Sequence, residues 1–499
     1  MSWTRDTLRQ WITDRLQGSR LIVVSNRAPY QFTQGERGWE AQQSVGGMAT
    51  TLEPVMRACG GTWIAQGDTE RPCANGMHLE SPRSGRYNLR TVTLNPAVAA
   101  GFYSGFSNGA LWPLCHTSFI RPRFSAADWE CYRIANEIFA DAIIEEAGSS
   151  PAFVFVQDYH FALLPALLKR RNPNLVIGQF WHIPWPNPEV CSVCPYLPEI
   201  VEGMLGCDLL GFQLRRFCEN FLSTVDQSVE AVADHVSLTV QRHGHLTQVR
   251  PFPISIDAEE HSVRAASKAV AKESLAWSMR LHNPFGHIGI GIDRLDYTKG
   301  IPERLQAIES LLLHYPEYRG LFHFVQIGVP SRTSVPEYRR LDTLVRQTVD
   351  RINDQWGTPT WRPVTYFNQA FSQTELMGLH LLARFCIVSS LHDGMNLVAK
   401  EFVASRNDGK GVLLLSRFAG AATELNGALL FNPYHLDETR ESIRAALEMK
   451  PAEVRHRMSL MRQSLDDNTV YRWAGKMLST MARYQTHSTI ESEPCASAR

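Results

Sequence analysis

The sequence contains no long apolar stretch, and its amino-terminal segment is not that of a secreted protein. No apolar run approaches the ~20 residues that span a bilayer. The first twenty residues, MSWTRDTLRQWITDRLQGSR, lack the apolar core and the cleavage site of a signal peptide. Their apolar residues recur at helical spacing and predict a short amphipathic helix. We therefore expect a cytoplasmic protein with no membrane partner.

An excess of one charge is also missing, because 50 Lys and Arg residues balance 50 Asp and Glu residues. Proteins that bind the phosphate backbone of DNA or RNA normally carry a basic field. We therefore expect no nucleic-acid partner. Any recognition of a charged ligand has to come from a local group of side chains.

Cysteines are few, and the carboxylate pattern of a metal site is absent. Ten cysteines in 499 residues do not make a disulfide framework. Cys191 and Cys194 form one C-x-x-C, but Cys207 and Cys218 do not supply a second pair at zinc-site spacing. The chain has no D-x-D, the arrangement that holds a diphosphate through Mg²⁺ or Mn²⁺. We expect buried or half-buried thiols, no metal and no cofactor.

Short β-branched runs alternate with longer segments of helical spacing. Strands are predicted at 21–26, 153–157, 175–181, 287–292, 322–328, 385–390 and 411–416, and clear helices at 128–147 and 302–315. Continuous apolar strands between helices are typical of parallel sheets covered on both faces. The predicted fold class is therefore α/β with doubly wound sheets.

This pattern occurs twice, which predicts two domains. The segment PFPISID (251–257) interrupts it and divides the chain into domains 1–255 and 256–470. A last helix at 471–485 can pack back across the first domain, and 486–499 reads as a loose tail. Ligands of open α/β sheets bind beyond the carboxyl ends of the strands. The residues that follow the predicted strands are therefore the site candidates.

Cations follow two strands of the second half. Arg294 and Lys299 lie in GIDRLDYTKG, and Arg332 lies in QIGVPSR. A guanidinium can fork onto a phosphate, and an ammonium adds a point charge. The three cations predict a site for more than one phosphate group, although a solvated surface is the plainer alternative.

The stretch LHDGMNLVAKE begins at the mouth of another predicted strand. Backbone N–H groups at Gly394 and the helix start can hold a diphosphate, and Asp393 can accept hydrogen bonds from a sugar. Glu401 follows about two helical turns later and can grip a ribose diol. Leu397 and Val398 would wall the pocket. The stretch therefore predicts a sugar-nucleotide site.

The first half offers weaker signals at the same positions. Gly46 and Gly47 precede a helix and can let backbone N–H groups approach a phosphate, although an ordinary tight turn explains them as well. Asp158 and His182 each follow a predicted parallel strand. They suit sugar hydroxyls or proton chemistry, while a structural histidine stays an equal alternative.

Ten stretches together resemble the trehalose-6-phosphate synthases, which are retaining glycosyltransferases of the GT-B architecture with two Rossmann-like domains facing a central cleft. They include VVSNRAP, SVGGMATTLEPVM, GFSNGALWPLCH, QDYHFALLP, FWHIPWPNPE, DRLDYTKGIPERL, HDGMNLVAKEFVA and LSRFAGAATELNGALLFNPY, and they span residues 21–434. The resemblance implies transfer of glucose from a nucleotide-glucose donor to glucose 6-phosphate, which gives α,α-trehalose 6-phosphate. UDP-glucose is the expected donor, with GDP- and ADP-glucose left open.

The resemblance also implies roles for matched positions. The residues implied for glucose 6-phosphate are Arg27, Tyr103, Trp112, Asp158 and Arg332. Those implied for the donor are Gly46, Gly47, His182, Arg294, Lys299, Phe371, Asp393, Gly394, Met395, Asn396, Leu397, Val398, Ala399, Lys400 and Glu401. The catalytic set within them is His182, Asp158, Arg294, Lys299 and Asp393. One departure is His392, which stands where the family often has arginine.

Retention in this family is expected to follow front-face substitution, without a covalent intermediate. One alternative is a glucosylglycerol-phosphate synthase that uses glycerol 3-phosphate, and another is a non-catalytic sugar-phosphate sensor. A glycosidase would need two carboxylates facing one bond, whereas Asp158 and Asp393 lie in different predicted domains. Self-association into a homo-oligomer is left open.

Overall fold

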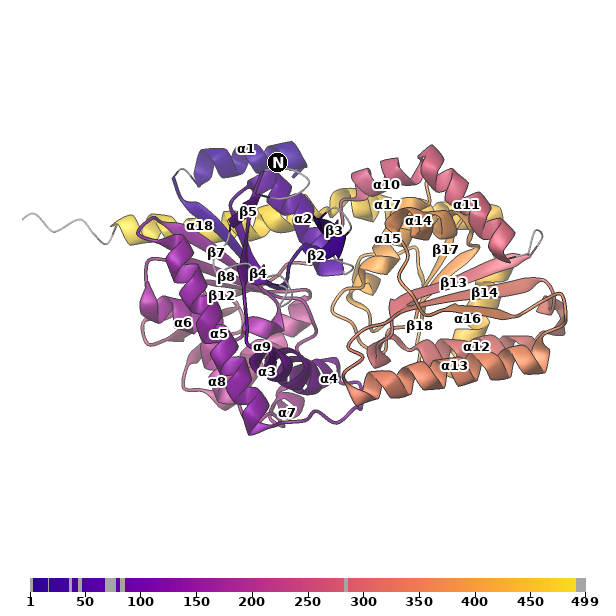
Figure 1. The fold of residues 1–499 in the computed structure, drawn as a ribbon, viewed down its shortest axis with the longest axis horizontal. Helices are drawn as coiled ribbons and strands as arrows, with labels where there is room; N and C mark the ends of the chain where they lie inside the picture. The colour runs from indigo at the N-terminus through magenta and orange to yellow at the C-terminus, as the bar shows by residue number, and fades with distance from the viewer. Residues whose placement is uncertain are drawn as a thin grey trace, which may run out of the picture. The chain divides into compact units, whose positions relative to one another are not determined.

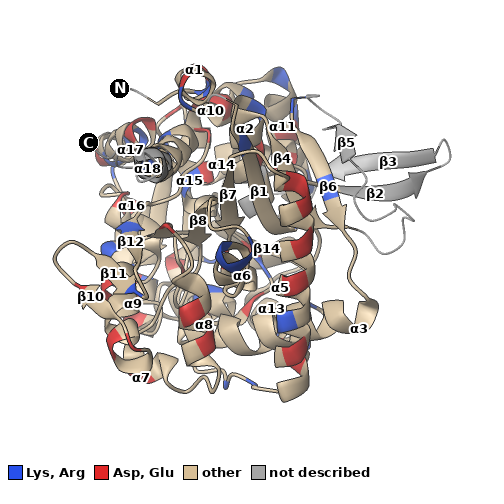
Figure 2. Ribbon diagram, turned by 90° about the vertical axis from the view of Figure 1, so that its left-hand side faces the viewer, with Lys and Arg blue, Asp and Glu red and all other residues tan. Residues whose placement is uncertain are grey.

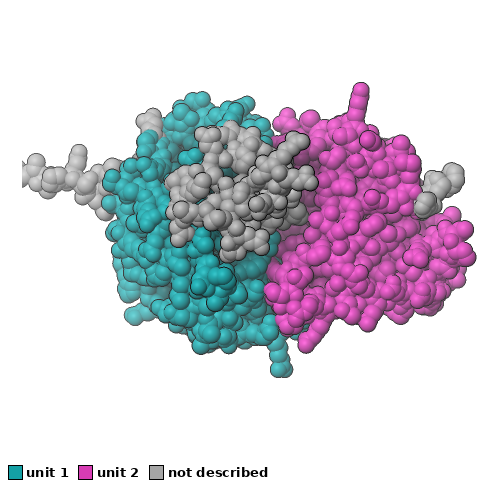
Figure 3. All heavy atoms as spheres, in the orientation of Figure 1, with its two compact units in different colours: residues 1–254, 470–499 teal, residues 255–469 magenta. Residues whose placement is uncertain are grey.

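The chain forms two compact units, 1–254 with 470–499 and 255–469 (Figures 1 and 3). The structure is a computed structural model that describes residues 3–16, 18–35, 38–43, 47–67, 78–80, 86–281 and 286–490. The chain leaves the first unit after Ile254 and returns to it at Val470. The boundaries expected from the sequence, 255 and 470, lie within one residue of these positions.

The first unit contains a ten-stranded sheet in its described part, in the order β10-β11-β12-β9-β8-β7-β1-β4-β6-β5. Its strands are β1 (Arg20–Arg27), β4 (Thr62–Gln66), β5 (His78–Glu80), β6 (Asn88–Val92), β7 (Ala152–Gln157), β8 (Val176–Trp181), β9 (Leu209–Phe212), β10 (Val232–Asp234), β11 (Thr239–Arg242) and β12 (His245–Pro251), and β2 (Tyr30–Gly35) pairs separately with β3 (Gly38–Gln43).

The helices of this unit cover that sheet and continue its βα pattern (Figure 1). They are α1 (Arg5–Arg15), α2 (Gly47–Cys59), α3 (Pro96–Ala99), α4 (Trp112–His116), α5 (Ala126–Ala147), α6 (Leu164–Arg171), α7 (Pro188–Cys191), α8 (Leu197–Met204), α9 (Arg215–Ser228) and α18 (Val470–Ile490), with the π-helix η1 (Ala100–Leu111) and the 3₁₀ turn η2 (Tyr159–Phe161).

The second unit contains a six-stranded parallel sheet in the order β15-β14-β13-β16-β17-β18. Its strands are β13 (His287–Arg294), β14 (Phe322–Val329), β15 (Val364–Phe367), β16 (Phe385–Val388), β17 (Val412–Ser416) and β18 (Leu429–Phe431). Its helices are α10 (Ala258–Ala265), α11 (Lys268–Leu281), α12 (Ile301–His314), α13 (Pro336–Trp356), α14 (Gln373–Leu382), α15 (Leu397–Ser405), α16 (Leu436–Glu448) and α17 (Pro451–Asp467), with the 3₁₀ turns η3 (Tyr297–Lys299), η4 (Pro316–Tyr318) and η5 (Gly420–Thr423).

Each sheet has a point where the strand order reverses. In the first unit the chain runs outward from β1 through β4 to β6, and from β7 through β8 to β9 in the other direction. In the second unit β13 and β16 are paired neighbours at the same kind of point. Loops diverge there and leave a crevice beyond the carboxyl ends of the strands. The topology therefore brings the loops after β1 and β7 together, and those after β13 and β16.

The predicted α/β pattern holds, but the first sheet also carries antiparallel strands that we did not predict. β10 and β11 extend it beyond β12, and β5 pairs antiparallel with β6. The β11–β12 turn has positive φ at His243 (50°) and Gly244 (79°), as a tight hairpin turn requires. These strands have only three or four residues each and include polar ones, so they lack the continuous apolar run that marks a parallel strand.

The carboxy-terminal helix is longer than predicted. α18 continues to Ile490, so residues 486–490, which we expected in a loose tail, are helical. Residues 491–499 lie outside the described residues. The helix packs on β8 and β9 at two glycines: a Cβ added at Gly178 would lie 2.5 Å from Sδ of Met481, and one at Gly211 would lie 3.1 Å from Sδ of Met477. Glycine at these positions lets the methionines reach the sheet.

Charges of both signs share the surface of the first unit. In Figure 2 acidic residues mark α5 and α8, and basic residues mark α6. Arg171 at the end of α6 contacts Asp141 of α5 at 2.6 Å. Exposed pairs of this kind contribute about 0–1 kcal/mol each. In the described part of the chain, none of the helices is both long and apolar enough to cross a membrane.

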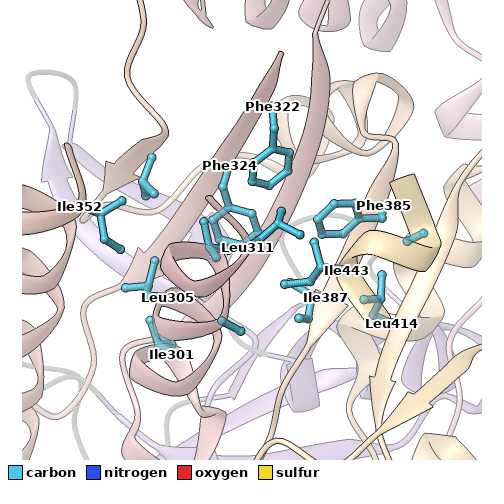
Figure 4. Close-up of a cluster of buried hydrophobic side chains, with 14 of the residues drawn as sticks. Ile301, Leu305, Leu311, Phe322, Phe324, Ile352, Phe385, Ile387, Leu414 and Ile443 are labelled. Carbon is cyan, nitrogen blue, oxygen red and sulfur yellow. The ribbon is translucent and has the colours of Figure 1, made fainter. Parts of the chain in front are cut away.

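The core of the second unit forms around the middle of its sheet (Figure 4). The rings of Phe322 and Phe385 stack with centroids 6.0 Å apart. Gly289 of β13 makes room for Phe385, because a Cβ there would lie 2.3 Å from Cζ of that ring. Gly291 is on the same face, and a Cβ there would lie 2.2 Å from Nη1 of Arg304. The two glycines of HIGIGI thus admit a phenylalanine and an arginine beneath the site.

Arg304 of α12 is completely buried against β13 and β16. Its Nη2 donates to Oδ2 of Asp293 at 2.6 Å and to the carbonyl of Lys299 at 3.0 Å, and its Nε donates to Oγ of Ser389 at 2.8 Å. Burial raises the pKa of Asp293 despite this partner. The pair ties the helix to both strands of the crevice.

We expect Arg304→Met to lower the free energy of unfolding by about 3–5 kcal/mol, because it leaves Asp293 buried and unpaired. Denaturant unfolding measures the change. The control is Arg346→Met, which removes an exposed pair with Asp342 and is expected to cost about 1 kcal/mol or less. Equal losses in the two variants would contradict a structural role for the buried pair.

Candidate active site

The first predicted residue, Arg27, is the last residue of β1. Its Nη2 donates to the hydroxyl of Tyr103 at 2.6 Å, and its guanidinium lies 5.6 Å from the centre of that ring. A cation held on an aromatic face and by a hydroxyl loses little further freedom on binding an anion. The structure therefore brings together Arg27 and Tyr103, which lie 76 residues apart in the chain.

A series of aromatic rings in contact connects this pair with Trp112. Tyr103 stacks on His160 at 5.8 Å and 8°, His160 lies 4.1 Å from Tyr159, and Tyr159 lies 5.8 Å from Trp112. The hydroxyl of Tyr159 also donates to Oδ1 of Asn108, at 2.8 Å. Aromatic pairs at these separations add about 0.5–1.5 kcal/mol each beyond the area they bury. The rings form a stiff wall on which Arg27 rests.

Asp158 and His182 meet because β7 and β8 are neighbours. Asp158 has φ of 74°, an uncommon conformation for a residue other than glycine, and its Oδ1 accepts from the backbone N–H of His182 at 3.2 Å. Nε2 of His182 lies 2.9 Å from Oε1 of Gln157. Burial lowers the pKa of His182 to about 3. The imidazole is therefore neutral near pH 7 and can act through hydrogen bonds but not as a cation.

One of the two predicted glycines, Gly47, lies at the start of α2. Gly47 is the first residue of that helix, so its position agrees with a helix N-terminus. Gly46 lies outside the described residues.

In the second unit the crevice between β13 and β16 contains Lys299 and Asp393. Nζ of Lys299 lies 2.5 Å from Oδ2 of Asp393. The same oxygen accepts from Oγ of Ser390 at 3.1 Å and from Nδ2 of Asn396 at 3.2 Å. A predicted phosphate-binding cation and a predicted sugar-binding carboxylate are thus direct partners.

Neighbouring backbone holds the loop from Asp393 to Asn396. The carbonyl of Asp393 accepts from N–H of Gly420 at 3.1 Å, and that of Met395 accepts from N–H of Ala421 at 2.8 Å. Asn396 has φ of 80°, and its side chain caps α15 by accepting from N–H of Ala399 at 3.1 Å. The first N–H groups of α15, at Leu397 and Val398, have no partner within the helix and point out of its start. The loop from Gly394 to Val398 can therefore present backbone donors to an anion.

Asp296 holds the other two cations of this edge. Its Oδ2 lies 3.1 Å from Nη1 of Arg332 and 3.9 Å from Nη2 of Arg294. The side chain of Arg332 is only 3% exposed, so it lies against the protein and not in solvent. Burial raises the pKa of Asp296, but Arg332, Arg294 and Lys299 outweigh it and lower the pKa to about 2.

These five charged side chains leave a small positive excess at the edge. Three cations (Arg294, Lys299 and Arg332) face two carboxylates (Asp296 and Asp393), which leaves one unit of positive charge. The start of α15 adds the partial positive charge of a helix N-terminus. The arrangement suits an anion that carries more than one negative charge.

The two charged residues of α15 differ in their surroundings. Nζ of Lys400 lies 2.6 Å from Oε2 of Glu424, and its side chain is 1% exposed. That side chain is therefore held within the unit, which the sequence did not predict. Burial alone raises the pKa of Glu401 to about 7. Among the described residues, no ion pair involves Glu401.

Phe371 is 9% exposed and lies in an aromatic cluster. Its ring is 5.1 Å from Trp277 and 5.5 Å from Phe367, and the guanidinium of Arg280 lies 5.9 Å from its centre. Most of the ring surface predicted to meet a nucleobase thus packs within the unit.

The C-x-x-C thiols are buried, as we predicted. Burial raises the pKa of Cys191 and of Cys194 to about 12, so both stay protonated near neutral pH. Within the described ranges, no cluster of three or more His, Cys, Asp or Glu side chains could hold a metal ion.

Sequence reasoning missed the buried residues that pair with the candidate residues or support their loops. Asp293, Asp296 and Arg304 lie inside the quoted motif DRLDYTKGIPERL, yet only its other two cations were assigned. The sequence did carry a signal for these residues: two aspartates and three cations occur within the thirteen residues of this motif, directly after a predicted buried strand. Charges buried at that density have to pair.

The sequence model described as glycosyltransferase family 20 matches residues 19–483. An α,α-trehalose-phosphate synthase of Schizosaccharomyces pombe, named as UDP-forming, is 33% identical to this chain over 98% of it and 95% of the relative.

Two solved structures are similar over most of their length. A UDP-forming α,α-trehalose-phosphate synthase from Burkholderia xenovorans in complex with glucose-6-phosphate has a TM-score of 0.85 and 30% identity, over 93% of this chain and 100% of the other. An E. coli structure bound with UDP-2-fluoro glucose has a TM-score of 0.83 and 30% identity, over 93% and 99%. These similarities confirm the predicted fold class and the family resemblance.

We expect Gly300→Ala to disrupt the Lys299 loop. Gly300 has φ of 61°, and a Cβ there would lie 2.2 Å from the carbonyl oxygen of Ser389. The variant should lose at least ~2 kcal/mol of stability. Thermal unfolding measures the loss.

The matched control is Gly409→Ala. Gly409 has φ of 65°, but its added Cβ would meet nothing closer than Cγ of Arg455 at 3.6 Å. It should lose only the ~1 kcal/mol that a left-handed backbone costs. Identical behaviour of the two variants would show that the contact with Ser389 does not matter.

Proposed function

This chain belongs to glycosyltransferase family 20, and on that premise we propose that it transfers glucose from UDP-glucose to glucose 6-phosphate, forming α,α-trehalose 6-phosphate. The observation that carries the proposal is the similarity over nearly the whole chain to UDP-forming synthases, one of them in complex with glucose-6-phosphate. Both substrates are small molecules, and we place the reaction in the cytoplasm.

The donor half of the proposal is supported by the second unit. Arg294, Lys299 and the N–H groups from Gly394 to Val398 would bind the diphosphate of UDP-glucose. Asp393 would accept hydrogen bonds from the glucose hydroxyls, and Glu401 from the ribose. Fixed cations beside a helix start are an established way to hold a diphosphate.

The acceptor half is supported by the paired residues of the first unit. Arg27 would bind the phosphate of glucose 6-phosphate, with Tyr103 holding the guanidinium in place. Trp112 and Asp158 would contact the sugar ring and its hydroxyls. Arg332 of the second unit is the other arginine assigned to that phosphate, and its contact with Asp296 would fix its direction.

The reaction would proceed by substitution at the front face of the donor sugar. The bond between C1 of glucose and the phosphate oxygen breaks, and the anomeric hydroxyl oxygen of glucose 6-phosphate bonds to C1. Its proton passes to the departing phosphate oxygen, so UDP leaves as the second product. Arg294, Lys299 and the backbone donors would stabilise the charge that develops on that oxygen. Neutral His182 would contribute hydrogen bonds near the reacting carbon.

An acceptor panel tests the proposal. We expect UDP release with glucose 6-phosphate, a product identified by NMR as α,α-trehalose 6-phosphate, and no loss of rate with a chelator. Glycerol 3-phosphate is the acceptor of the alternative synthase, and GDP- and ADP-glucose test the donor. Rapid turnover with glycerol 3-phosphate alone, or no turnover with either acceptor, would overturn the assignment.

We expect Arg332→Ala to raise the KM for glucose 6-phosphate by about tenfold or more, because a charged hydrogen bond to phosphate is lost. The KM for UDP-glucose should change much less. Arg294→Ala should instead lower kcat by about 100-fold or more, since its contact strengthens as charge develops. Steady-state kinetics in both substrates decides between them, and the reverse pattern would show that the two arginines were assigned to the wrong substrates.

We expect the KM for UDP-glucose to rise as the pH falls from 8 to 6. Burial sets the pKa of Glu401 near 7, so acidification protonates the carboxylate and weakens its hydrogen bonds to the ribose. The change should approach ~10-fold, the value of one charged hydrogen bond. In Glu401→Gln the KM should be high at every pH and should lack this dependence. A wild-type KM that is flat over this range would contradict the role.

A further inference from the structure

We propose that Asp296 is a positioning residue that sets the directions of Arg294 and Arg332 together, and so couples the donor and acceptor contacts of the second unit. This inference rests on the proposed function, because it takes those two arginines as the diphosphate and phosphate ligands. Asp296 itself is 0% exposed and would not touch either substrate.

Asp296 lies between β13 and the 3₁₀ turn η3, and it contacts the segment after β14 and helix α13. Its Oδ2 faces Nη1 of Arg332 at 3.1 Å and Nη2 of Arg294 at 3.9 Å. Its Oδ1 accepts from N–H of Thr298 at 3.1 Å and from Oγ1 of Thr298 at 2.9 Å. The first oxygen thus serves the arginines, while the second holds the turn that leads to Lys299. One carboxylate therefore fixes all three cations relative to β13.

Tyr338 of α13 completes this arrangement. Its hydroxyl lies 2.6 Å from Nη1 of Arg332 and 3.3 Å from Oδ2 of Asp296, and its ring is buried. Arg332 has φ of 49°, which costs about 1–3 kcal/mol for a residue of this kind and persists only where the surroundings enforce it. The contacts of its guanidinium with Asp296 and Tyr338 belong to the surroundings that hold Arg332 in place.

Charge and position make opposite demands at this residue. A fixed anion beside phosphate-binding cations weakens the local positive field and, by charge alone, opposes phosphate binding. The pKa of Asp296 lies at about 2, since its cationic partners outweigh its burial, so the carboxylate is ionised throughout the working range. An anion retained against that electrostatic cost is explained if it orients the arginines.

The variant Asp296→Asn separates the two effects by the sign of the change. The amide keeps an acceptor for Thr298 but loses the charge that holds the arginines. If Asp296 positions them, the KM for glucose 6-phosphate should rise by about tenfold or more and kcat should fall as well. If it only weakens the field, both KM values should fall. A lower or unchanged KM for the phosphorylated acceptor would overturn the inference.

Tyr338→Phe is the second variant, and it keeps the charge of Asp296. It removes the hydrogen bonds of the Tyr338 hydroxyl with Arg332 and with Asp296, and none with Arg294. We expect a higher KM for glucose 6-phosphate with the KM for UDP-glucose unchanged. Equal changes in the two KM values would mean that Tyr338 supports the fold and not the direction of Arg332, and would count against the inference.

Asp208→Asn is the matched control for the loss of a buried carboxylate. Asp208 lies in the first unit, contacts Nζ of Lys169 at 2.9 Å and accepts from N–H of Ile177 at 2.7 Å. It directly precedes β9 and so lies at the amino end of that strand, whereas the candidate residues of this unit lie at the carboxyl ends of β1, β7 and β8. This variant should lose stability with both KM values unchanged. Asp296→Glu, which retains the charge, should recover part of the lost activity.

Binding measurements keep this inference separate from the proposed function. Titration calorimetry with UDP alone reports the donor contacts whatever the acceptor is. If the wild type binds UDP but does not use glucose 6-phosphate, the proposed function fails. Weaker UDP binding by Asp296→Asn than by Asp208→Asn would then still support the positioning of Arg294, and equal binding would refute it.

Discussion

Cations that bind a phosphate repel one another as long as no phosphate is bound. This constraint determines how the charged residues are arranged at the carboxyl ends of β13 and β14 in the second unit. Like charges a few ångströms apart repel by several kcal/mol at the effective dielectric of a protein surface. Asp296 and Asp393 offset that repulsion for Arg294, Arg332 and Lys299. They leave one positive charge in excess, so the cations are stabilised in place and still attract an anion.

The motif from Gly289 to Arg304 meets this constraint with three kinds of residue. Its glycines admit Phe385 and the guanidinium of Arg304 and let the chain turn beside Ser389. Its Asp293 pairs with Arg304, its Asp296 pairs with Arg332 and Arg294, and its Lys299 pairs with Asp393. These roles depend on one another. A side chain at Gly291 would clash with the guanidinium of Arg304, and without Arg304 the carboxylate of Asp293 would be buried and unpaired.

Much of this arrangement could be predicted from the sequence, and the limits have physical causes. Seven parallel strands (β1, β7, β8, β13, β14, β16 and β17) and the helices α5 and α12 were predicted because their apolar periodicity is local. The other parallel strands, β4, β6, β9, β12, β15 and β18, were not predicted. Nor was the pairing of β10, β11 and β5, because short half-exposed strands carry little pattern. The loops after strands pointed to Arg294, Lys299 and Asp393. The contact of Lys400 with Glu424 and the inward direction of Arg332 depend on residues 24 and 36 positions away. Spacing along the chain does not encode such contacts.

The two units fix their candidate residues by different interactions, aromatic packing in the first and buried ion pairs in the second. The difference matches the proposed roles of the two units, acceptor binding and stabilisation of the leaving group. In the first unit the guanidinium of Arg27 lies against Tyr103, which stacks on His160, so aromatic packing and hydrogen bonds dominate. In the second unit buried ion pairs dominate, with side chains between 0% and 14% exposed for all but Arg294. Salt screens such pairs weakly. Cations fixed in this way need little rearrangement when a leaving group gains charge, which is the condition under which electrostatic stabilisation lowers a barrier most.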